Sequence, residues 1–583
     1  MKNKNRLFLI CLVLIVILAG GCAKTEQDKS KGITPSVQEG TKDQPSGSQA
    51  DGEKIDSNNS EGNQDTNKDV IPYQYTQKLN TINDNYRNVY EIFPYSFYDS
   101  NGDGIGDLKG ITSKLDYIND GNPNTDSDLG FDAIWLMPIM PSTTYHKYDV
   151  INYYNIDPQY GTLDDFKTLL LECHKRGIKV ILDYVFNHTS AKHPWFIQAK
   201  DYLESLKEGE KPDLKKCPYV AYYHYTNDYN GDKGYHRVGT TEWYYEGAFW
   251  DQMPDLNLGN KAVRKEIEKA SKFWLDMGVD GFRLDAAKEY YSGEQERNIE
   301  VLKWFSEYVK SVKKDAYLVA EVWDEEAAIT NYYKSGIQSL FNFPLSQHNG
   351  LITSAVRKLG TMTGKSFVNS VISLHDQYQK GNQNFIDAPF ISNHDTTRIS
   401  AQCLNNEDQM KLSAGVLLTM NGSPYVYYGE EIGMNSMGTK DENKRLPMQW
   451  SGKEQTGMSL PAPNADKVEQ KFGTVEDQMK NPLSIYNYYK RAIRIRNENP
   501  EIARGTQTAL EELSSKDIGA LSKDYQGSKI VILYNFGAET NLVNLTSDLK
   551  TLSIRGYLTV DGSEVTLKDG VVTLPKYAIA ILK

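Results

Sequence analysis

The feature that most constrains the fold is a repeated alternation of apolar runs with amphipathic stretches after Tyr73. Eight runs are rich in β-branched and aromatic residues: NVYEIFPYSF, FDAIWLMP, IKVILDYVFNH, VDGFRLDA, AYLVAEVW, GIQSLFNF, APFISNHD and SPYVYYGEE. Helical patterns such as LDDFKTLLLECHKRG lie between many of them. Near-continuous apolar strands alternating with helices are typical of a parallel sheet covered on both faces. Eight units predict an α/β fold, a (β/α)8 TIM barrel, with an open doubly wound sheet as the alternative.

The length of 583 residues predicts more than one domain. We assign residues 76–188 and 259–504 to the barrel. Residues 189–258 interrupt it after the third strand and are rich in Tyr, Gly and Asp, so they form an inserted domain, called the B domain here. After about residue 505 the helical patterns stop, and alternating runs such as TLSIRGYLTV predict a C-terminal antiparallel β-sandwich domain over 505–583.

The N-terminus reads as a targeting segment. The basic MKNKNR precedes twelve apolar residues, LFLICLVLIVIL, and then AGGC. Twelve residues are fewer than the about 20 that span a bilayer. The small residues before Cys22 resemble a bacterial lipoprotein signal over 1–22, although Ala19 stands where leucine is usual and Leu18 lies one residue further back. We expect a cell-surface lipoprotein anchored at Cys22, or else an ordinary secreted protein.

Residues 23–75 are predicted to be a disordered tether. No aromatic residue occurs from Ala23 to Pro72, so the segment buries too little apolar surface to offset its ordering entropy. The net charge of −12 argues against a nucleic-acid partner, and the membrane is expected only at the lipid anchor. Outside the signal, the odd number of cysteines without CxxC spacing predicts buried thiols: Cys173, Cys217 and Cys403.

Charged residues gather at the ends of the predicted strands. In VDGFRLDA, Arg283 and Asp285 are two residues apart and therefore point to the same face of a strand. Buried charges are costly unless they are paired. Strand three ends in Asp183, strand five in Glu321, and strand seven in Asn393, His394 and Asp395. Strand ends of a barrel converge on one cleft, where barrel enzymes have their active sites.

Five segments carry a family resemblance. DYVFNH, GFRLDAAKE, EVW and FISNHD resemble, in order and spacing, the signature segments of the α-amylase family of glycoside hydrolases. MPDLN, at 253–257, resembles a fifth segment, in the form typical of the group intermediate between oligo-1,6-glucosidases and neopullulanases. The resemblance runs from about Tyr86 to the C-terminus and implies an enzyme that hydrolyses α-glucosidic bonds.

The resemblance also implies the catalytic roles. Asp285 would be the nucleophile, Glu321 the proton donor, and Asp395 the stabiliser of the transition state. Retaining hydrolysis needs two carboxyl groups about 5–5.5 Å apart. Arg283 would keep the nucleophile ionised by charge and hydrogen bonding, whereas the negative neighbours of Glu321 would raise its pKa so that it holds a proton.

The resemblance implies a set of substrate-binding residues as well: Tyr148, His188, Arg283, His394, Lys288, Asp441 and Arg445. The two histidines would hydrogen-bond the sugar at the cleavage subsite, and Tyr148 would stack on its ring. A packed aromatic is the alternative for Tyr148, and a surface ion pair for Asp441 with Arg445. Glu289 stands where many relatives have histidine. We therefore do not transfer from the relatives any role in binding the leaving-group side of the substrate.

A second motif has the pattern of a metal-binding loop. DSNGDGIGD offers oxygen ligands at alternate positions, which is how a short loop wraps Ca²⁺: Asp99, Asn101, Asp103, the carbonyl of Ile105, and Asp107. It lacks the glutamate that closes an EF-hand, and a simple Gly-Asp turn is the alternative. Similar loops bind Ca²⁺ in relatives. The family's other common calcium site would use Asn187 and Asp255, but neopullulanase-like relatives often lack it.

Together these patterns predict an exported α-amylase that cleaves internal α-1,4 bonds in starch or maltodextrins. Neopullulanase, cyclomaltodextrinase and α-glucosidase activities are alternatives with the same chemistry. Relatives that act on cyclic or branched substrates often carry an N-terminal β-domain for dimerisation. The tether takes its place here and favours a monomer. A non-catalytic glycan-binding lipoprotein is the alternative from another class, and loss of one carboxylate would mark it.

Overall fold

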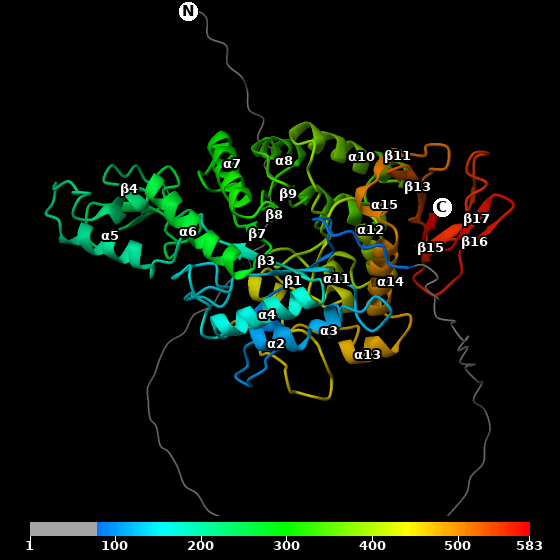
Figure 1. Cartoon of the computed structure of the whole chain (residues 1–583), viewed down its shortest axis with the longest axis horizontal. Coiled ribbons are helices and arrows are strands. Elements are labelled where there is room, and N and C mark those ends of the chain that lie inside the picture. Colours follow the sequence, from blue (N-terminus) through cyan, green and yellow to red (C-terminus); the bar gives the residue numbers. More distant parts are fainter. Residues whose placement is uncertain (1–77, 233) are drawn as a thin grey trace, which may run out of the picture. The chain divides into compact units, whose positions relative to one another are not determined.

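The computed structural model describes residues 78–232 and 234–583, so the predicted signal peptide (1–22) and the whole predicted tether (23–75) are outside the described residues. Seven parallel strands form one sheet in the order β10-β1-β2-β3-β7-β8-β9 (Figure 1). Their bounds are β1 (Val89–Ile92), β2 (Ala133–Leu136), β3 (Lys179–Tyr184), β7 (Gly281–Leu284), β8 (Tyr317–Ala320), β9 (Ser339–Leu340) and β10 (Tyr425–Tyr427).

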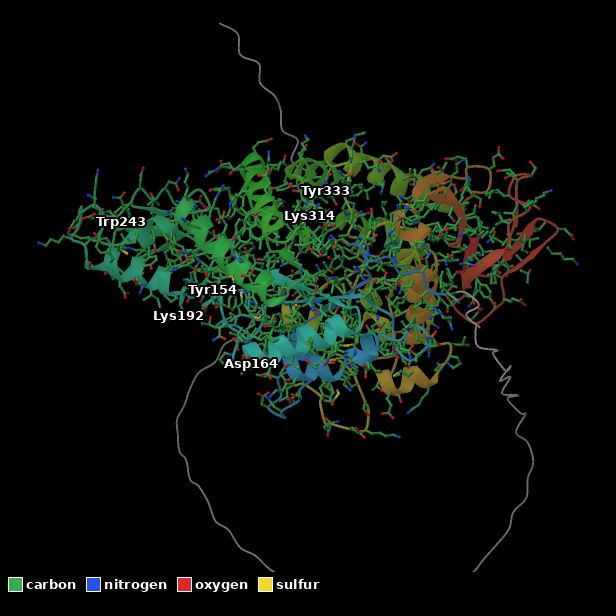
Figure 2. All side chains as sticks on the ribbon, viewed as in Figure 1. Tyr154, Asp164, Lys192, Trp243, Lys314 and Tyr333 are labelled. Atoms are coloured by element: carbon green, nitrogen blue, oxygen red, sulfur yellow. The ribbon has the colours of Figure 1, made fainter. Side chains whose placement is uncertain are left out.

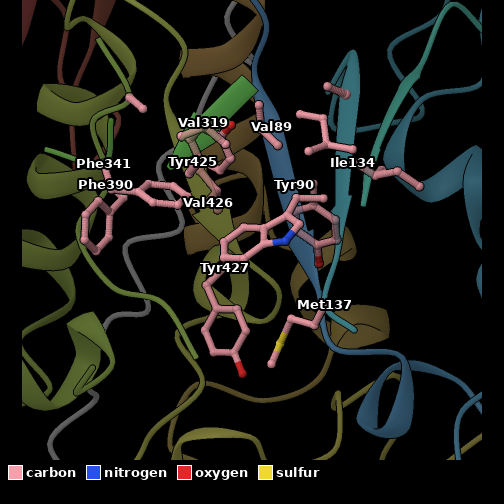
Figure 3. Packing of buried hydrophobic residues seen from close by; sticks show 14 of the residues in the cluster. Val89, Tyr90, Ile134, Met137, Val319, Phe341, Phe390, Tyr425, Val426 and Tyr427 are labelled. Carbon is pink, nitrogen blue, oxygen red and sulfur yellow. The ribbon is translucent and has the colours of Figure 1, made fainter. Parts of the chain in front are cut away.

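An eighth segment, residues 388–390, closes the sheet into a barrel. Phe341, just after β9, forms a parallel bridge with Ala388, and Phe390 forms one with Tyr425 of β10. The rings of Phe341 and Phe390 lie 5.5 Å apart and pack with Tyr425 among the buried residues (Figure 3). The closed ring confirms the predicted (β/α)8 fold and excludes an open sheet.

Helices follow the strands and bury one apolar face each. In α6, Val263, Ile267, Ala270 and Trp274 repeat at helical spacing and are buried. The helices of this part are α1 (Pro94–Phe97), α2 (Leu108–Ser113), α3 (Leu115–Ile118), α4 (Leu163–Lys175), α6 (Lys261–Met277), α7 (Gln295–Val312), α8 (Glu326–Tyr332), α9 (Leu351–Arg357), α10 (Gly364–Gly381), α11 (Ile399–Gln402), α12 (Glu407–Leu418), α13 (Val475–Lys480), α14 (Ile485–Glu498) and α15 (Glu501–Arg504).

The strand β7 is buried along its whole length. It begins with Gly281, where an added Cβ would lie 2.0 Å from the carbonyl oxygen of Tyr317 on β8. Only glycine permits this close approach of two strands. The apolar residues of β7 thus lie in the barrel wall, and the burial extends to its charged third residue, Arg283.

Between β3 and α6 the chain forms the small inserted domain. It contains α5 (Pro194–Ser205) and an antiparallel sheet in the order β4-β6-β5, formed by β4 (Tyr225–Thr226), β5 (Tyr235–Arg237) and β6 (Tyr244–Glu246). Figure 2 labels Trp243, which directly precedes β6. An isolated bridge between His188 and Asp255 joins the two ends of the insertion at the barrel.

The C-terminal domain consists of two antiparallel sheets around a separate apolar cluster. One sheet has the order β11-β12-β13-β18-β15, the other β14-β17-β16. β15 and β18 contact α14 and α12, so the larger sheet also packs on the barrel (Figure 1). The strands are β11 (Thr506–Ala509), β12 (Ile518–Tyr525), β13 (Ser528–Asn535), β14 (Asn541–Asn544), β15 (Ile554–Leu558), β16 (Thr566–Lys568), β17 (Val571–Leu574) and β18 (Ile579–Leu582).

Two further observations concern the cysteines and the length and polarity of the helices. Cys173, Cys217 and Cys403 are free and buried, as predicted. Among the helices of residues 78–232 and 234–583, none has both the length and the apolar character needed to cross a bilayer.

Candidate active site

One buried arginine connects the carboxylates at the ends of three strands. Arg283, whose side chain is 1% exposed, donates from Nη1 to Asp183 Oδ1 at 2.9 Å and to Asp285 Oδ1 at 2.6 Å. Its Nη2 donates to Glu321 Oε2 at 2.7 Å. The alternation in VDGFRLDA predicted a contact between Arg283 and Asp285. The structure shows that the same guanidinium also pairs with Glu321 of the next strand and with Asp183 of the preceding one.

Glu321, directly after β8, is a carboxyl group whose surroundings favour the protonated form. Burial raises its pKa, and the negative charges of Asp285 and Asp395 raise it further against the opposing effect of Arg283. Its Oε2 accepts a hydrogen bond from the backbone N–H of Ala286 at 3.1 Å. Ala286 has φ 47, in the left-handed region, a conformation that costs about 1 kcal/mol or more. The sequence predicted the direction of the shift but not that burial is its main cause.

Asp395 has two cationic partners. His394 Nε2 lies 2.8 Å from Asp395 Oδ2, and Arg445 Nη2 lies 2.7 Å from Asp395 Oδ1. Burial alone would raise the pKa of Asp395, but these two charges outweigh it and hold the pKa well below the usual range. These two partners therefore favour the ionised form of Asp395.

His394 is itself enclosed between two acids. Its Nδ1 donates to Glu91 Oε1 at 2.6 Å, on the opposite side of the ring from Asp395. Burial opposes a charged imidazole, but Asp395 and Glu91 outweigh it and raise the pKa of His394 to about 9. Glu91, on β1, was not identified from the sequence as a site residue.

Tyr148 and His188 lie beside this charged group. The Tyr148 hydroxyl donates to Asp183 Oδ2 at 3.0 Å, and its ring stacks on His394 at 5.6 Å between centroids. His188 Nε2 lies 3.2 Å from the carbonyl oxygen of Tyr148. Burial lowers the pKa of His188, which favours a neutral ring that can both donate and accept.

The resemblance implies that Asp441 and Arg445 both contact the sugar, and the alternative is an ion pair between them; in the structure each pairs with a different residue. Arg445 is buried and bonds Asp395, whereas Asp441 accepts from Lys444 Nζ at 2.9 Å within a 3₁₀ helix, Asp441–Lys444. Lys444 also donates to the carbonyl oxygen of Asp395 at 2.8 Å. The 3₁₀ helix thus places Arg445 in contact with Asp395 and leaves Asp441 exposed.

All three predicted catalytic carboxylates line one cavity of about 490 Å³, a volume typical of ligand sites. Lys288 lies on its wall, with Nζ 2.8 Å from Asp324 Oδ2, and beside it Glu289 accepts a hydrogen bond from Ser292. The lining residues are Tyr148, His188, Phe249, Met253, Asp285, Ala286, Lys288, Glu289, Glu321, Trp323, Asp395, Asp441 and Lys444.

The predicted metal loop is held by its own hydrogen bonds. Asp99 accepts from the N–H groups of Asn101, Gly102 and Gly104, and Asp107 accepts from Gly110 at the start of α2. Two other predicted ligands, Asn101 and Asp103, are exposed to solvent. Within the described ranges no group of three or more His, Cys, Asp or Glu side chains is arranged to hold a metal ion.

Asn187 and Asp255, predicted for a second metal site, lie together. Asn187 Nδ2 donates to Asp255 Oδ1 at 3.1 Å. Burial raises the pKa of Asp255 to about 7. The Oδ1 atom of Asn187 is buried and has no hydrogen-bond partner in the described part of the chain. Such an orphaned oxygen is expected to have a ligand, ion or water.

Comparison with known proteins was made against family models, curated sequences and solved structures. Residues 91–505 match the family model described as "Alpha amylase, catalytic domain". "Alpha-amylase 3" of Dictyoglomus thermophilum is 38% identical over 472 residues, which cover 80% of this chain and 87% of that protein. "Oligo-1,6-glucosidase" of Parageobacillus thermoglucosidasius is 29% identical and covers 80% of this chain and 94% of its own. The solved structure of Eubacterium rectale Amy13B has a TM-score of 0.83 and 46% identity, over 87% of this chain and 97% of that one.

Proposed function

Since this chain belongs to the alpha-amylase family of glycoside hydrolases, we propose that it is an α-amylase, which cleaves internal α-1,4-glucosidic bonds in starch and maltodextrins. The observation that carries the proposal is the cavity in which Asp285, Glu321 and Asp395 meet. A relative named as an α-amylase, at 38% identity, supports the choice of substrate.

The proposed reaction is a double displacement with retained anomeric configuration. Asp285 attacks the anomeric carbon while Glu321, which burial helps to keep protonated, gives its proton to the leaving glycosidic oxygen. Asp395, held ionised by His394 and Arg445, stabilises the positive charge that develops on the sugar ring. Glu321 then removes a proton from the water that hydrolyses the glycosyl–Asp285 ester.

The remaining residues are proposed to hold the sugar at the cleavage subsite. Tyr148 presents its ring and His188 its imidazole to the cavity. Lys288, Asp441 and Lys444 lie on the wall, within reach of hydroxyl groups. His394, Arg283 and Arg445 act through the carboxylates that they contact.

Oligo-1,6-glucosidase, neopullulanase, cyclomaltodextrinase and α-glucosidase are the alternatives. A relative of the first name matches the same share of the chain, 80%, as the α-amylase relative does. The test is a maltoheptaoside with a blocked non-reducing end and a chromogenic group at the other, compared with pullulan and cyclodextrin. We expect rapid cleavage of the blocked substrate. Cleavage only of unblocked chains, or preference for pullulan or cyclodextrin, would contradict α-amylase action.

We also propose that the loop from Asp99 to Asp107 binds Ca²⁺. Oxygen ligands at alternate positions and the solvent exposure of Asn101 and Asp103 support this site, and the orphaned oxygen of Asn187 supports a second one beside Asp255. When bound, the ion would hold the loop in one conformation. Calcium in excess over EDTA is expected to raise the melting temperature by a few degrees.

Matched variants separate the sites. Asp103→Ala should remove the loop's share of the calcium-dependent rise and Asp255→Ala that of the second site. The exposed Asp228→Ala should change nothing. A melting temperature that does not respond to calcium in the wild-type protein would contradict both sites.

The same proposal extends to location and assembly: a monomer at the cell surface, anchored by lipid at Cys22 and held off the membrane by residues 23–75. The basic, apolar and small residues of 1–22 support it. Cys22→Ser should release the enzyme from the membrane fraction. Equal membrane association of wild type and variant would contradict the anchor, and light scattering would measure the monomer.

A further inference from the structure

A buried glutamate on the first strand of the barrel fixes the histidine that precedes Asp395. Glu91 lies on β1, and its side chain is 1% exposed. Its Oε1 atom accepts two hydrogen bonds from one residue, His394: one from the ring Nδ1 at 2.6 Å and one from the backbone N–H at 3.4 Å. This double contact sets the orientation of the imidazole ring relative to the barrel wall.

The partners of the imidazole ring accept hydrogen bonds from both of its nitrogens. On the opposite side of the ring from Glu91, Nε2 lies 2.8 Å from Asp395 Oδ2 and 2.7 Å from the hydroxyl of Tyr148. The Tyr148 hydroxyl donates its own proton to Asp183, so it accepts from Nε2. A neutral imidazole has one N–H and cannot donate from both nitrogens. The geometry therefore requires the charged imidazolium form of His394.

Charged and titratable groups surround His394 and Glu91. Three tyrosines among them stay neutral, because burial raises the pKa of each well above its usual range. Arg283 disfavours a second positive charge, but it is bound to three acids. Burial also opposes a charge on His394, so the imidazolium depends on its two adjacent carboxylates. The groups that face the two side chains are Tyr148, Asp183, Arg283, Asp395, Tyr425 and Tyr427.

The charge on His394 controls the state of Asp395. His394 binds one carboxylate oxygen and Arg445 the other, so both oxygens are held, and the 28% exposed side chain lines the active-site cavity. Loss of the proton on Nε2 would leave a lone pair 2.8 Å from Asp395 Oδ2. The carboxylate would then turn away or take up a proton. Either change would weaken the stabilisation of positive charge on the sugar ring.

We infer that Glu91 is a positioning residue: it keeps His394 in the charged form that holds Asp395 ionised and directed into the cavity. The inference rests on the proposed function, in which Asp395 stabilises the transition state. Glu91 is not one of the described residues that line the cavity, so it acts through His394. It thereby sets an upper pH limit for the step that forms the glycosyl–Asp285 ester.

The test removes the charge of Glu91 and keeps its shape, in the variant Glu91→Gln. Because ionisation of Glu321 would itself limit hydrolysis at high pH, the parent protein and the variant both carry Glu321→Gln. The substrate is α-maltosyl fluoride, from which Asp285 displaces fluoride without a proton donor. The kcat/KM for this substrate reports formation of the ester and not its hydrolysis.

The expected result is a shift of the alkaline limb. In the parent, kcat/KM should be half-maximal near the pKa of His394, about 9. In Glu91→Gln the half-maximal point should lie at least about one pH unit lower, towards the ordinary value for histidine. At about pH 6, where the ring is still charged, kcat/KM of the two proteins should agree within about threefold.

The matched control is Glu431→Gln in the same parent. Glu431 is also a buried glutamate, but it accepts hydrogen bonds from the hydroxyls of Tyr90 and Tyr117. This substitution should leave the half-maximal pH unchanged. An alkaline limb that Glu91→Gln does not move, or a loss of kcat/KM by the same factor at every pH, would overturn the inference.

A spectroscopic measurement covers the case in which Glu91→Gln does not fold or the parent is too slow to assay. Nitrogen NMR of histidine-labelled wild-type protein reports the protonation of each ring, and His394→Asn identifies the signals of His394. Both ring nitrogens should carry protons at about pH 8. A neutral His394 ring at that pH would overturn the inference. If the wild-type protein cleaves neither starch nor the fluoride, the proposed function itself fails.

Discussion

The two ends of the strand β7 carry charge clusters of opposite composition. At the amino end one acid meets two lysines and a histidine: Asp280 lies 2.7 Å from His174 Nε2, 3.1 Å from Lys179 Nζ and 3.2 Å from Lys313 Nζ. At the carboxyl end one cation, Arg283, meets three acids. The same strand therefore ends in an excess of positive partners on one side and of negative partners on the other.

The difference in burial decides what each cluster does. The three side chains around Asp280 are 25–38% exposed, so solvent screens the charges of this cluster. Burial raises the pKa of Asp280, but His174 and the neighbouring donors outweigh it and hold the pKa well below the usual range. Around Arg283 the excess acid is enclosed, and burial raises the pKa of Asp183 to about 7. At the amino end Asp280 stays ionised, whereas at the carboxyl end a carboxyl group of the cluster can hold a proton.

Removing the proposed proton donor at the carboxyl end, Glu321, should have the largest effect. In Glu321→Gln the side chain keeps its shape but can no longer transfer a proton, so kcat on starch should fall about 10³-fold. Stopped assays of reducing-sugar release measure this, and circular dichroism should show an unchanged fold. The exposed Glu296→Gln on α7 is the control. Equal activity of Glu321→Gln and wild type would rule out its catalytic role.

Removing the single cation should affect stability as well as activity. Arg283→Met leaves three acids without their shared partner, and breaking a buried pair costs about 3–5 kcal/mol. Urea unfolding at pH 7 measures this loss. The matched variant is Arg297→Met, whose partner Glu294 is 53% exposed, and which should lose at most about 1 kcal/mol. Similar losses of unfolding free energy in both variants would mean that the ion pairs of Arg283 are no better shielded from solvent than a surface ion pair.

The pH dependence of stability distinguishes the buried imidazole at the carboxyl end. The pKa of His394 rises from 6.5 to about 9 on folding. The resulting stability is complete below pH 6.5 and is lost as pH rises through 9. A shift of this size corresponds to up to about 3 kcal/mol. Melting temperatures between pH 6 and 10 should fall less steeply in His394→Asn than in the exposed His348→Asn; identical slopes would contradict this reading.

The smallest effect is expected at the amino end. Asp280→Asn leaves His174, Lys179 and Lys313 facing one another without their shared acid, at a cost of about 2 kcal/mol in unfolding free energy. Specific activity of the folded protein should not change, because Asp280 lies at the far end of β7 from the cavity. A variant that keeps its stability but loses activity would reverse the comparison between the two ends.

The sequence predicts the features that depend on how apolar and polar residues alternate over a short stretch of chain. Alternation placed Arg283 and Asp285 on one side of a strand, and the eight apolar runs predicted the barrel, which the structure confirms. The short segment that closes the barrel, 388–390, also falls within one of these runs, APFISNHD.

Features that depend on distant partners could not be predicted in this way. Glu91 and His394 are 303 residues apart, and a single glutamate at the end of a strand gives no signal of its partner. The resemblance implied sugar contacts for Asp441 and Arg445, with an ion pair between them as the alternative. The 3₁₀ turn instead brings Lys444 to Asp441 and turns Arg445 towards Asp395. Burial, which dominates the pKa of Glu321, is a property of the whole fold.

The way in which the barrel closes has a consequence for its motions. β7 is paired along its length with β3 and β8, whereas 388–390 joins its neighbours only through the bridges at Phe341 and Phe390. Fluctuations that separate strands cost least where fewest hydrogen bonds must break together. The breathing of the barrel should concentrate at this seam. Because Asp395 follows the seam within a few residues, we expect its distance from the other two carboxylates to vary more than their distance from each other.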